Sequence, residues 1–95
     1  MGGGRWYRLA GSGGDALPLT SPGYGHCGTL YPGWLSGGRY PAAAEGVAEM
    51  TACFDGSSPC YGHAAVGVVR CDGFLLWRLA DAPDCSGYCT AASGL

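Results

Sequence analysis

Six cysteines, at positions 27, 53, 60, 71, 85 and 89, limit what this 95-residue chain can fold into. Thiols stay reduced in the cytosol, whereas small secreted domains commonly carry this density of cysteines as disulfides. The even count permits a closed set of bridges. The chain also has 19 glycines and 6 prolines, and glycine loses more backbone freedom on folding than any other residue. We therefore expect a small oxidised domain whose fold depends on its disulfides.

Charge and hydropathy exclude several classes of function. The chain has five basic and seven acidic residues and a net charge of −2, so it lacks the cations with which a nucleic-acid-binding domain neutralises phosphates. It has no apolar run approaching about 18 residues, so we expect no membrane insertion by this segment. The sequence contains no asparagine, so no N-glycan can be attached to it.

The clearest local structure is predicted on the C-terminal side. Two apolar runs, 64–71 and 74–79, flank Asp72-Gly73, a dipeptide that favours the positive φ angles of a type I′ hairpin turn. This spacing predicts an antiparallel hairpin over 64–80. The stretch 47–54 is read as a further strand.

Glycine and proline interrupt the N-terminal half of the chain. We predict disorder for residues 1–4, a short strand-like run over 6–9 and no regular structure over 15–26. Further along, Pro32-Gly33 is interpreted as a turn between bulky side chains.

The order and spacing of several short motifs resemble a known family. The motifs are WYRL with a Gly-Gly loop (Trp6–Gly14), Cys27, Trp34-Leu35, Glu45-Gly46, Cys53, Cys60, the hairpin opened by Cys71, and PDCSGYC (Pro83–Cys89). Together they are similar to the eight-cysteine domain of uromodulin, of the major glycoprotein of pancreatic zymogen granules and of a related liver zona-pellucida protein. The similarity covers residues 5–90, which leaves 91–95 as a C-terminal tail or linker.

The strand pattern and the resemblance together predict a mainly β, disulfide-rich domain with short antiparallel hairpins and long irregular loops. The resemblance implies a non-catalytic extracellular module, structural or adhesive in role. Its expected neighbours are EGF-like or zona-pellucida modules of a longer secreted or membrane-anchored glycoprotein. The first residues contain no apolar segment of the kind found in signal peptides, so we expect this chain to be a fragment of something longer.

The resemblance also implies disulfide pairings, namely Cys27 with Cys89 and Cys53 with Cys60. In uromodulin-like members, the cysteines that match Cys71 and Cys85 pair with cysteines upstream of the Trp-Tyr-Arg motif, outside this chain. These two bond either to each other, if no upstream partners exist, or to an N-terminal segment that this chain lacks. Chain-entropy arguments give roughly 4 kcal/mol for the longer implied bridge and roughly 2.5 kcal/mol for the shorter one.

Two departures from the family pattern bear on structure and function. One family cysteine is Ser21 here, and its expected partner is Tyr61 or is deleted, so both are absent together. The positions that carry N-glycans in uromodulin-type proteins are Ser36 and Arg78 here. The role of those glycans as ligands for bacterial fimbrial lectins therefore does not transfer to this chain.

Zinc is the main alternative use of the cysteines, and it would make the chain an intracellular zinc-binding protein. Possible ligands fall in three close pairs: Cys60 and His63, Cys85 and Cys89, and His26 and Cys27. Structural zinc sites use four cysteine or histidine ligands, commonly from close-spaced pairs, but the sequence has no Cys-x-x-Cys pair. We therefore favour disulfides and predict no metal.

Catalysis and cofactor binding are not predicted either. Every cysteine has a disulfide role, which leaves no thiolate for His26 or His63 to activate. Asp81 and Asp84 are interpreted as solvated turn residues. The loop 11–16 fits part of a dinucleotide-binding pattern, but the prolines that follow it exclude the helix that such a site needs, so we expect no cofactor.

The aromatic side chains leave a second function open. We predict that Trp6, Trp34 and Trp77 form the core, because few other large side chains are available. Exposed aromatics beside arginine can instead stack on sugars or anchor a protein partner. Several tyrosines in glycine-rich loops fit either role, namely Tyr24, Tyr31 and Tyr40. The alternative function is therefore a glycan- or protein-binding module that uses its Tyr/Arg loops.

Overall fold

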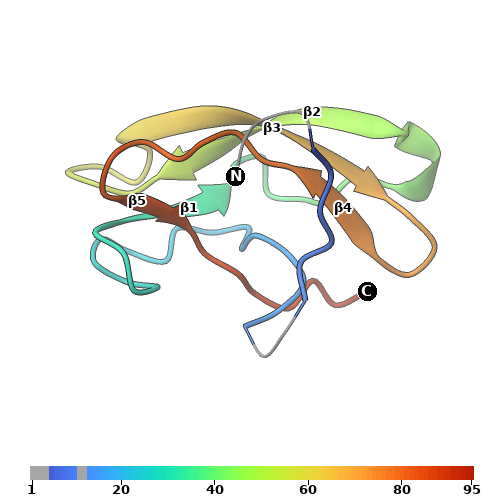
Figure 1. Cartoon of the computed structure of the whole chain (residues 1–95), viewed down its shortest axis with the longest axis horizontal. Coiled ribbons are helices and arrows are strands. Elements are labelled where there is room, and N and C mark those ends of the chain that lie inside the picture. Colours follow the sequence, from blue (N-terminus) through green and yellow to red (C-terminus); the bar gives the residue numbers. More distant parts are fainter. Residues whose placement is uncertain (1–4, 11–12) are drawn as a thin grey trace.

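A computed structural model describes residues 5–10 and 13–95 of the chain. Five strands form one sheet in the order β4-β3-β2-β1-β5 (Figure 1). The elements are β1 (Tyr31–Leu35), the 3₁₀ helix η1 (Ala43–Glu45), β2 (Val47–Phe54), β3 (Gly62–Arg70), β4 (Leu75–Arg78) and β5 (Ser86–Tyr88). The predicted mainly β, disulfide-rich fold is confirmed. The predicted disorder of residues 1–4, and residues 11–12 of the glycine-rich loop, fall outside the described residues.

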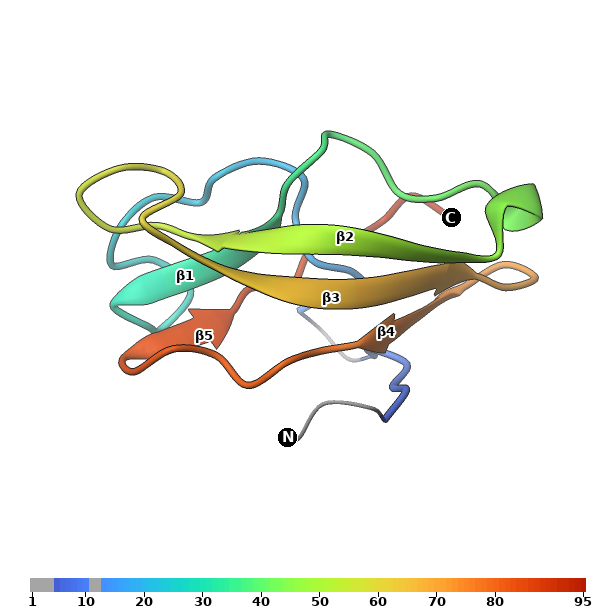
Figure 2. The same cartoon turned by 90° about the horizontal axis from the view of Figure 1, so that it is seen from above.

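The two longest strands, β2 and β3, pair antiparallel along the long axis of the molecule (Figures 1 and 2). Successive side chains of a strand point to opposite faces of the sheet. Phe54, Val66 and Val68 are buried on one face, whereas Val47 on the other face is 52% exposed. The strand predicted over 47–54 is confirmed, and the sheet has one face on the core and one toward solvent.

The predicted hairpin is also present, and β3 pairs antiparallel with β4 around a two-residue turn. The Cys71 N–H donates to the carbonyl of Phe74 at 2.7 Å. In the turn itself Gly73 has a positive φ of 83°, and Asp72 does not. Because a type I′ turn needs positive φ at both central residues, the predicted turn type is wrong although the hairpin is right.

Residues 30–35 do not turn at Pro32-Gly33 as predicted. They contain β1, which pairs antiparallel with β2 and parallel with β5. The Pro32 carbonyl accepts a hydrogen bond from the N–H of Asp55 at 3.0 Å. Gly33 lies against the ring of Phe54, where a Cβ would come within 2.5 Å of Cε1. The glycine therefore serves the close approach of a ring and not a turn, which is why the sequence prediction fails here.

The core lies between the sheet and irregular segments that cross one of its faces (Figure 1). Ala16, in the blue segment, is completely buried and forms an isolated antiparallel bridge with Ala91. The N–H and hydroxyl of Ser93 donate to the Asp15 carboxylate at 2.7 and 2.6 Å. Within the segment 91–95, Ala91 and Ser93 are therefore hydrogen bonded to the body of the domain. No helix within residues 5–10 and 13–95 is long and apolar enough to cross a membrane.

The three tryptophans occupy different environments. Trp77 is completely buried, as predicted. Trp6 is 38% exposed, with the guanidinium of Arg78 5.5 Å from its ring centroid, so the core prediction is wrong for this residue. Trp34 is half-buried. The short strand predicted around Trp6 is reduced to a single bridge between Tyr7 and Trp77.

Candidate functional site

Two disulfides close loops of very different length. Cys27 is bonded to Cys89 across 62 positions, with Cα atoms 5.7 Å apart. Cys53 is bonded to Cys60 across seven positions, with Cα atoms 4.8 Å apart. The first bridge ties the loop before β1 to the residue after β5, and the second closes the loop between β2 and β3. They join the same cysteines that the resemblance pairs.

The thiols of Cys71 and Cys85 are free. Cys71 follows the end of β3, whereas the Cys85 carbonyl accepts a hydrogen bond from the N–H of Tyr31, the first residue of β1. These points lie at opposite ends of the sheet (Figures 1 and 2), roughly 26 Å apart at the rise of an extended strand. A disulfide needs Cα atoms within about 7 Å. The conditional Cys71–Cys85 bridge is therefore not formed, and this fold excludes it.

Asp55 is a buried carboxylate at the end of β2, and it is only 2% exposed. One oxygen, Oδ2, accepts hydrogen bonds from the Ser21 hydroxyl at 2.6 Å and the Gly23 N–H at 2.8 Å. The other, Oδ1, accepts from Nε1 of Trp34 at 2.9 Å. Three protein donors replace water around the charge. Asp55 thereby fixes the loop before β1 to the sheet.

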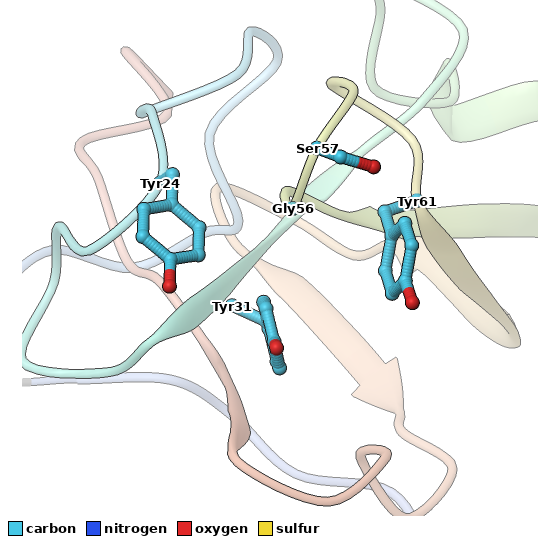
Figure 3. A pocket seen from close by; sticks show the side chains of 5 residues that line it. All are labelled: Tyr24, Tyr31, Gly56, Ser57 and Tyr61. Atoms are coloured by element: carbon cyan, nitrogen blue, oxygen red, sulfur yellow. The ribbon is translucent and has the colours of Figure 1, made fainter.

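An open pocket of about 520 Å³ lies beside Asp55, and three tyrosines surround it (Figure 3). Its lining is Tyr24, Tyr31, Gly56, Ser57 and Tyr61. The ring centroids of Tyr24 and Tyr31 are 5.8 Å apart with a tilt of 57°. Those of Tyr31 and Tyr61 are 5.9 Å apart with a tilt of 28°. Tyr24 is 55% and Tyr61 is 64% exposed, and exposed aromatic clusters of this kind are typical of interaction sites.

The rings at either side of the pocket are held by neighbouring residues. A Cβ on Gly56 would lie 2.6 Å from Cγ of Tyr61, so the absence of a side chain there lets the ring lie against the backbone. The Cys53–Cys60 bridge closes the loop that carries Gly56. On the other side, the Gly23 N–H bond to Asp55 fixes the residue before Tyr24. Both loops that form the pocket are thus tied to the sheet.

Tyr40 does not line the pocket, unlike Tyr24 and Tyr31, the other two tyrosines whose role the sequence left open. Its ring packs edge-to-face on Trp77 with centroids 6.3 Å apart, and its hydroxyl donates to the Leu17 carbonyl at 2.6 Å. Burial raises the pKa of this phenol above its ordinary value. Tyr40 therefore belongs to the core.

Sequence reasoning missed Asp55 and the role of Tyr61. Asp55 opens the string Asp-Gly-Ser-Ser-Pro, which has the composition of an ordinary exposed turn. The donors that make it a buried residue come from distant positions and cannot be seen in a local pattern. One signal was present in the sequence: Ser21 and Tyr61 stand where the family has cysteines. Both residues border the hollows beside Asp55.

The metal and Cys-His alternatives find little support in the geometry. The sulfurs of Cys27, Cys60 and Cys89 are in disulfides, so they are not free to bind zinc. His26 and His63 are exposed. Within residues 5–10 and 13–95, no three His, Cys, Asp or Glu side chains come close enough to hold a metal ion.

The positions that correspond to family N-glycans have structural contacts here. Ser36 follows β1, and its N–H donates to the Thr51 carbonyl at 2.9 Å. Arg78 lies across Gly67 on the solvent face of the sheet and forms an ion pair with Glu49. Both positions contribute to the sheet and its surface.

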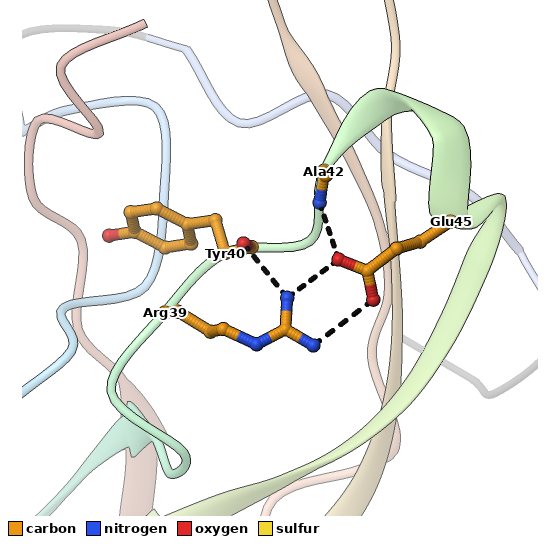
Figure 4. A network of polar contacts seen from close by, with 4 residues as sticks. All are labelled: Arg39, Tyr40, Ala42 and Glu45. Carbon is orange, nitrogen blue, oxygen red and sulfur yellow. Dashed lines mark hydrogen bonds and ion pairs between the residues drawn. The ribbon is translucent and has the colours of Figure 1, made fainter.

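A second polar network lies around η1 (Figure 4). Arg39 donates to both carboxylate oxygens of Glu45, at 2.6 and 3.1 Å. Glu45 also accepts from the Ala42 N–H at 2.7 Å. The bond to Arg39 and the Ala42 N–H lower the pKa of Glu45 from 4.5 to about 2. The ring of Tyr40 points away from this ion pair (Figure 4). Arg39 and Glu45 do not line the tyrosine pocket, so the network stabilises only the turn around η1.

Comparison with known proteins gives the family. Residues 7–90 match the family described as the uromodulin-like D-8-C domain, the eight-cysteine domain. The chain belongs to this uromodulin-like family. The resemblance seen in the sequence is thereby confirmed over residues 7–90 of this chain.

The domain is similar to part of the protein named pancreatic secretory granule membrane major glycoprotein GP2. It is 42% identical over 91 residues to the protein of Canis lupus familiaris, an alignment that covers 93% of this chain and 18% of that relative. It is 36% identical over 88 residues to the protein of Homo sapiens, and this alignment covers 90% of this chain and 16% of that relative. The chain therefore spans less than a fifth of the length of these relatives.

Proposed function

We propose that this uromodulin-like domain is a non-catalytic extracellular module of a longer secreted or membrane-anchored glycoprotein, in which it acts as a rigid structural or adhesive unit. The observation that carries this proposal is the distribution of its cysteines. Two bridges lie inside the chain, and two free thiols lie at opposite ends of the sheet. In an oxidising compartment, cysteines without internal partners tend to pair outside the chain. Cys71 and Cys85 would then join the domain to neighbouring sequence at two points.

The relatives and the site chemistry support this proposal. The relatives are named as glycoproteins of a secretory granule membrane, which fits an oxidising route through the cell. Asp55, a buried carboxylate that could serve as a base, has both oxygens engaged by protein donors. EGF-like or zona-pellucida modules are the neighbours that the family implies, within residues outside this chain.

The experiment uses the longer natural protein, purified with its thiols blocked and digested without reduction. Peptide mapping is expected to find Cys71 and Cys85 each bonded to a cysteine outside this chain. Alkylated Cys71 and Cys85 in that protein, or a bond between the two, would contradict the proposal. One equivalent of bound zinc per chain would favour the intracellular alternative instead.

A second role is ligand binding at the tyrosine pocket. The observation that favours it is the convergence of three partly or largely exposed rings on one opening (Figure 3). A spacer alone gives no reason to leave this much aromatic surface in water. Arginine does not line this pocket, so the predicted Tyr/Arg site is here a tyrosine site. Of the two free cysteines, Cys85 is the one near this pocket, because its carbonyl accepts a hydrogen bond from the N–H of Tyr31 at 3.2 Å.

A further inference from the structure

We propose that the pocket formed by Tyr24, Tyr31 and Tyr61 binds a neutral sugar, with a pyranose ring lying across the tyrosine rings. This inference deepens the binding role proposed above and rests on it. It is independent of the spacer role.

The charge of the pocket disfavours an acidic ligand. Its five lining residues are three tyrosines, a glycine and a serine, and none carries a formal charge. The nearest carboxylate, Asp55, is 2% exposed and already accepts three hydrogen bonds. An acidic ligand would lose hydration here without gaining an opposite charge. A sugar without ionised groups has no such cost.

The spacing of the rings decides how the ligand lies. A flat ligand between two aromatic faces needs about 7 Å between them, since carbon atoms in contact are about 3.5–4.0 Å apart. The ring centroids of Tyr24 and Tyr61 lie 5.8 and 5.9 Å from that of Tyr31, which leaves no room for a ligand between Tyr31 and either neighbour. The ligand therefore lies across the exposed faces of Tyr24 and Tyr61. An aromatic face is electron-rich and attracts the positively polarised C–H groups of a pyranose face.

The hydroxyl groups of the pocket distinguish a sugar from a proline-rich peptide. Among the described residues, no hydrogen bond engages the phenols of Tyr24, Tyr31 or Tyr61. By contrast, the phenols of Tyr40 and Tyr88 donate to backbone carbonyls at 2.6 and 2.7 Å. The pocket phenols are thus available as donors and acceptors. A ligand rich in hydroxyls can both donate to these phenols and accept from them, whereas a proline peptide has carbonyl acceptors but no backbone N–H donor.

The site is also formed before any ligand arrives. The short disulfide closes the loop beneath Tyr61, and the hydrogen bond from Gly23 to Asp55 fixes the loop beneath Tyr24. A pocket whose walls are already ordered loses less conformational entropy on binding. The volume of about 520 Å³ falls within the range of small-ligand sites, about 300–1,000 Å³.

The test is a nuclear magnetic resonance titration of the oxidised, ¹⁵N-labelled chain. The probes are the methyl glycosides of glucose, galactose, mannose and N-acetylglucosamine, with a proline decapeptide as the competing ligand class. We expect saturable amide shifts at Tyr24, Tyr31, Gly56, Ser57 and Tyr61 with at least one glycoside. Sialic acid, which carries a negative charge, is expected to bind more weakly than the neutral sugar.

Substitutions then assign the binding to the rings. Tyr61→Ala and Tyr24→Ala are each expected to weaken binding by at least about fivefold through loss of an aromatic face. Gly56→Ala is expected to weaken binding too, because the new Cβ displaces the Tyr61 ring without removing it. Trp6→Ala is the matched control, since Trp6 is an exposed aromatic outside the pocket. Each variant is first checked for the same two disulfides.

Several outcomes overturn the proposal. These are the absence of saturable shifts at the pocket with every glycoside, shifts with the proline peptide alone, or binding that survives Tyr24→Ala and Tyr61→Ala. None of these outcomes contradicts the proposed structural role, which depends on how the cysteines pair. Failure of sugar binding is therefore distinguishable from failure of the proposed module.

Discussion

At the scale of a single residue, the carboxylate of Asp55 shows how one buried charge organises two loops. It accepts hydrogen bonds from Ser21, Gly23 and Trp34, which lie 34, 32 and 21 positions away in the sequence. A charge-assisted hydrogen bond is stronger than a neutral one, and a donor left unpaired in a buried site is costly. The loop before β1 and the side chain of Trp34 therefore depend on this carboxylate.

Replacing Asp55 with alanine is expected to lower the free energy of unfolding by about 3 kcal/mol, because the Ser21 hydroxyl and the Gly23 N–H lose their acceptor. Nε1 of Trp34 then keeps only its hydrogen bond to the Pro59 carbonyl. Urea unfolding of the oxidised protein measures this. Asp84→Ala, at an exposed aspartate, is the control and is expected to change stability by less than about 0.5 kcal/mol. Equal stability of the two variants would show that the Asp55 network is not stabilising.

The pH dependence of stability tests the Arg39–Glu45 pair. The pKa of Glu45 is lowered from 4.5 to about 2 by the hydrogen bonds from Arg39 and Ala42, so the folded state binds a proton less readily than the unfolded state. Its stabilisation is present above pH 4.5 and is lost as the pH falls toward 2. Hydrogen bonds from Ser93 lower the pKa of Asp15 in the same direction.

The melting temperature of Glu45→Gln is therefore expected to depend less on pH between those two values than that of the unchanged protein. The effect is small, because both partners are substantially exposed. Thermal unfolding at a series of pH values measures it, with Glu49→Gln as a control at a carboxylate outside this turn. A Glu45→Gln profile parallel to that of the unchanged protein would rule out the pair as a pH-dependent contributor.

Prediction from sequence succeeds at this scale only where the cause is local. The net charge of −2 excluded nucleic-acid binding, because net charge is counted directly from the residues and does not depend on the fold. The burial of Asp55 depends on partners more than 20 positions away, so local composition suggested a turn. Trp6 was predicted to be buried for want of other large side chains, whereas Leu17, Leu35 and Phe54 fill the core instead.

At the scale of elements, the long strands follow from their sequence and β1 does not. The strand over 47–54 and the hairpin after it have bulky β-favouring residues and a recognisable turn. β1 contains Pro32 and Gly33, residues that favour turns in isolation. The contact between Gly33 and the Phe54 ring makes the glycine compatible with a strand, and that contact exists only in the folded sheet.

Gly33→Ala is expected to destabilise the domain by about 1–3 kcal/mol, because the added methyl group overlaps the Phe54 ring. Gly62→Ala is the matched control. Gly62 is also a strand glycine beside Phe54, but there the nearest atom to an added Cβ is at an ordinary contact distance of 3.7 Å. Unfolding by urea compares the two, and equal losses of stability would refute the role assigned to Gly33.

At the scale of the whole molecule, the Cys27–Cys89 bridge links the N-terminal loops to the end of β5. A bridge over this span contributes roughly 4 kcal/mol by restricting the unfolded chain, against roughly 2.5 kcal/mol for the Cys53–Cys60 loop. These values are comparable with the total stability of a small domain, about 5–15 kcal/mol. The fold is therefore expected to depend on oxidation.

Replacing Cys27 and Cys89 together with serine is expected to destabilise the domain more than replacing Cys53 and Cys60 together. Thermal unfolding of both double variants gives the order. A Cys53/Cys60 variant that is the less stable of the two would contradict the dependence on loop length.

The position of the free cysteines is a property of the whole molecule and could not be read from the sequence. The family resemblance left Cys71 and Cys85 open to two partners, and the topology removes one of them by placing these residues at opposite ends of the sheet. The most direct measurement is the intact mass of the chain, made in an oxidising compartment and alkylated without reduction. The expected result is two labels, mapped to Cys71 and Cys85. No labels would mean that these two cysteines bond to each other, and six labels would mean that the chain is not a disulfide-bonded domain; either result would contradict the fold and the role proposed for it.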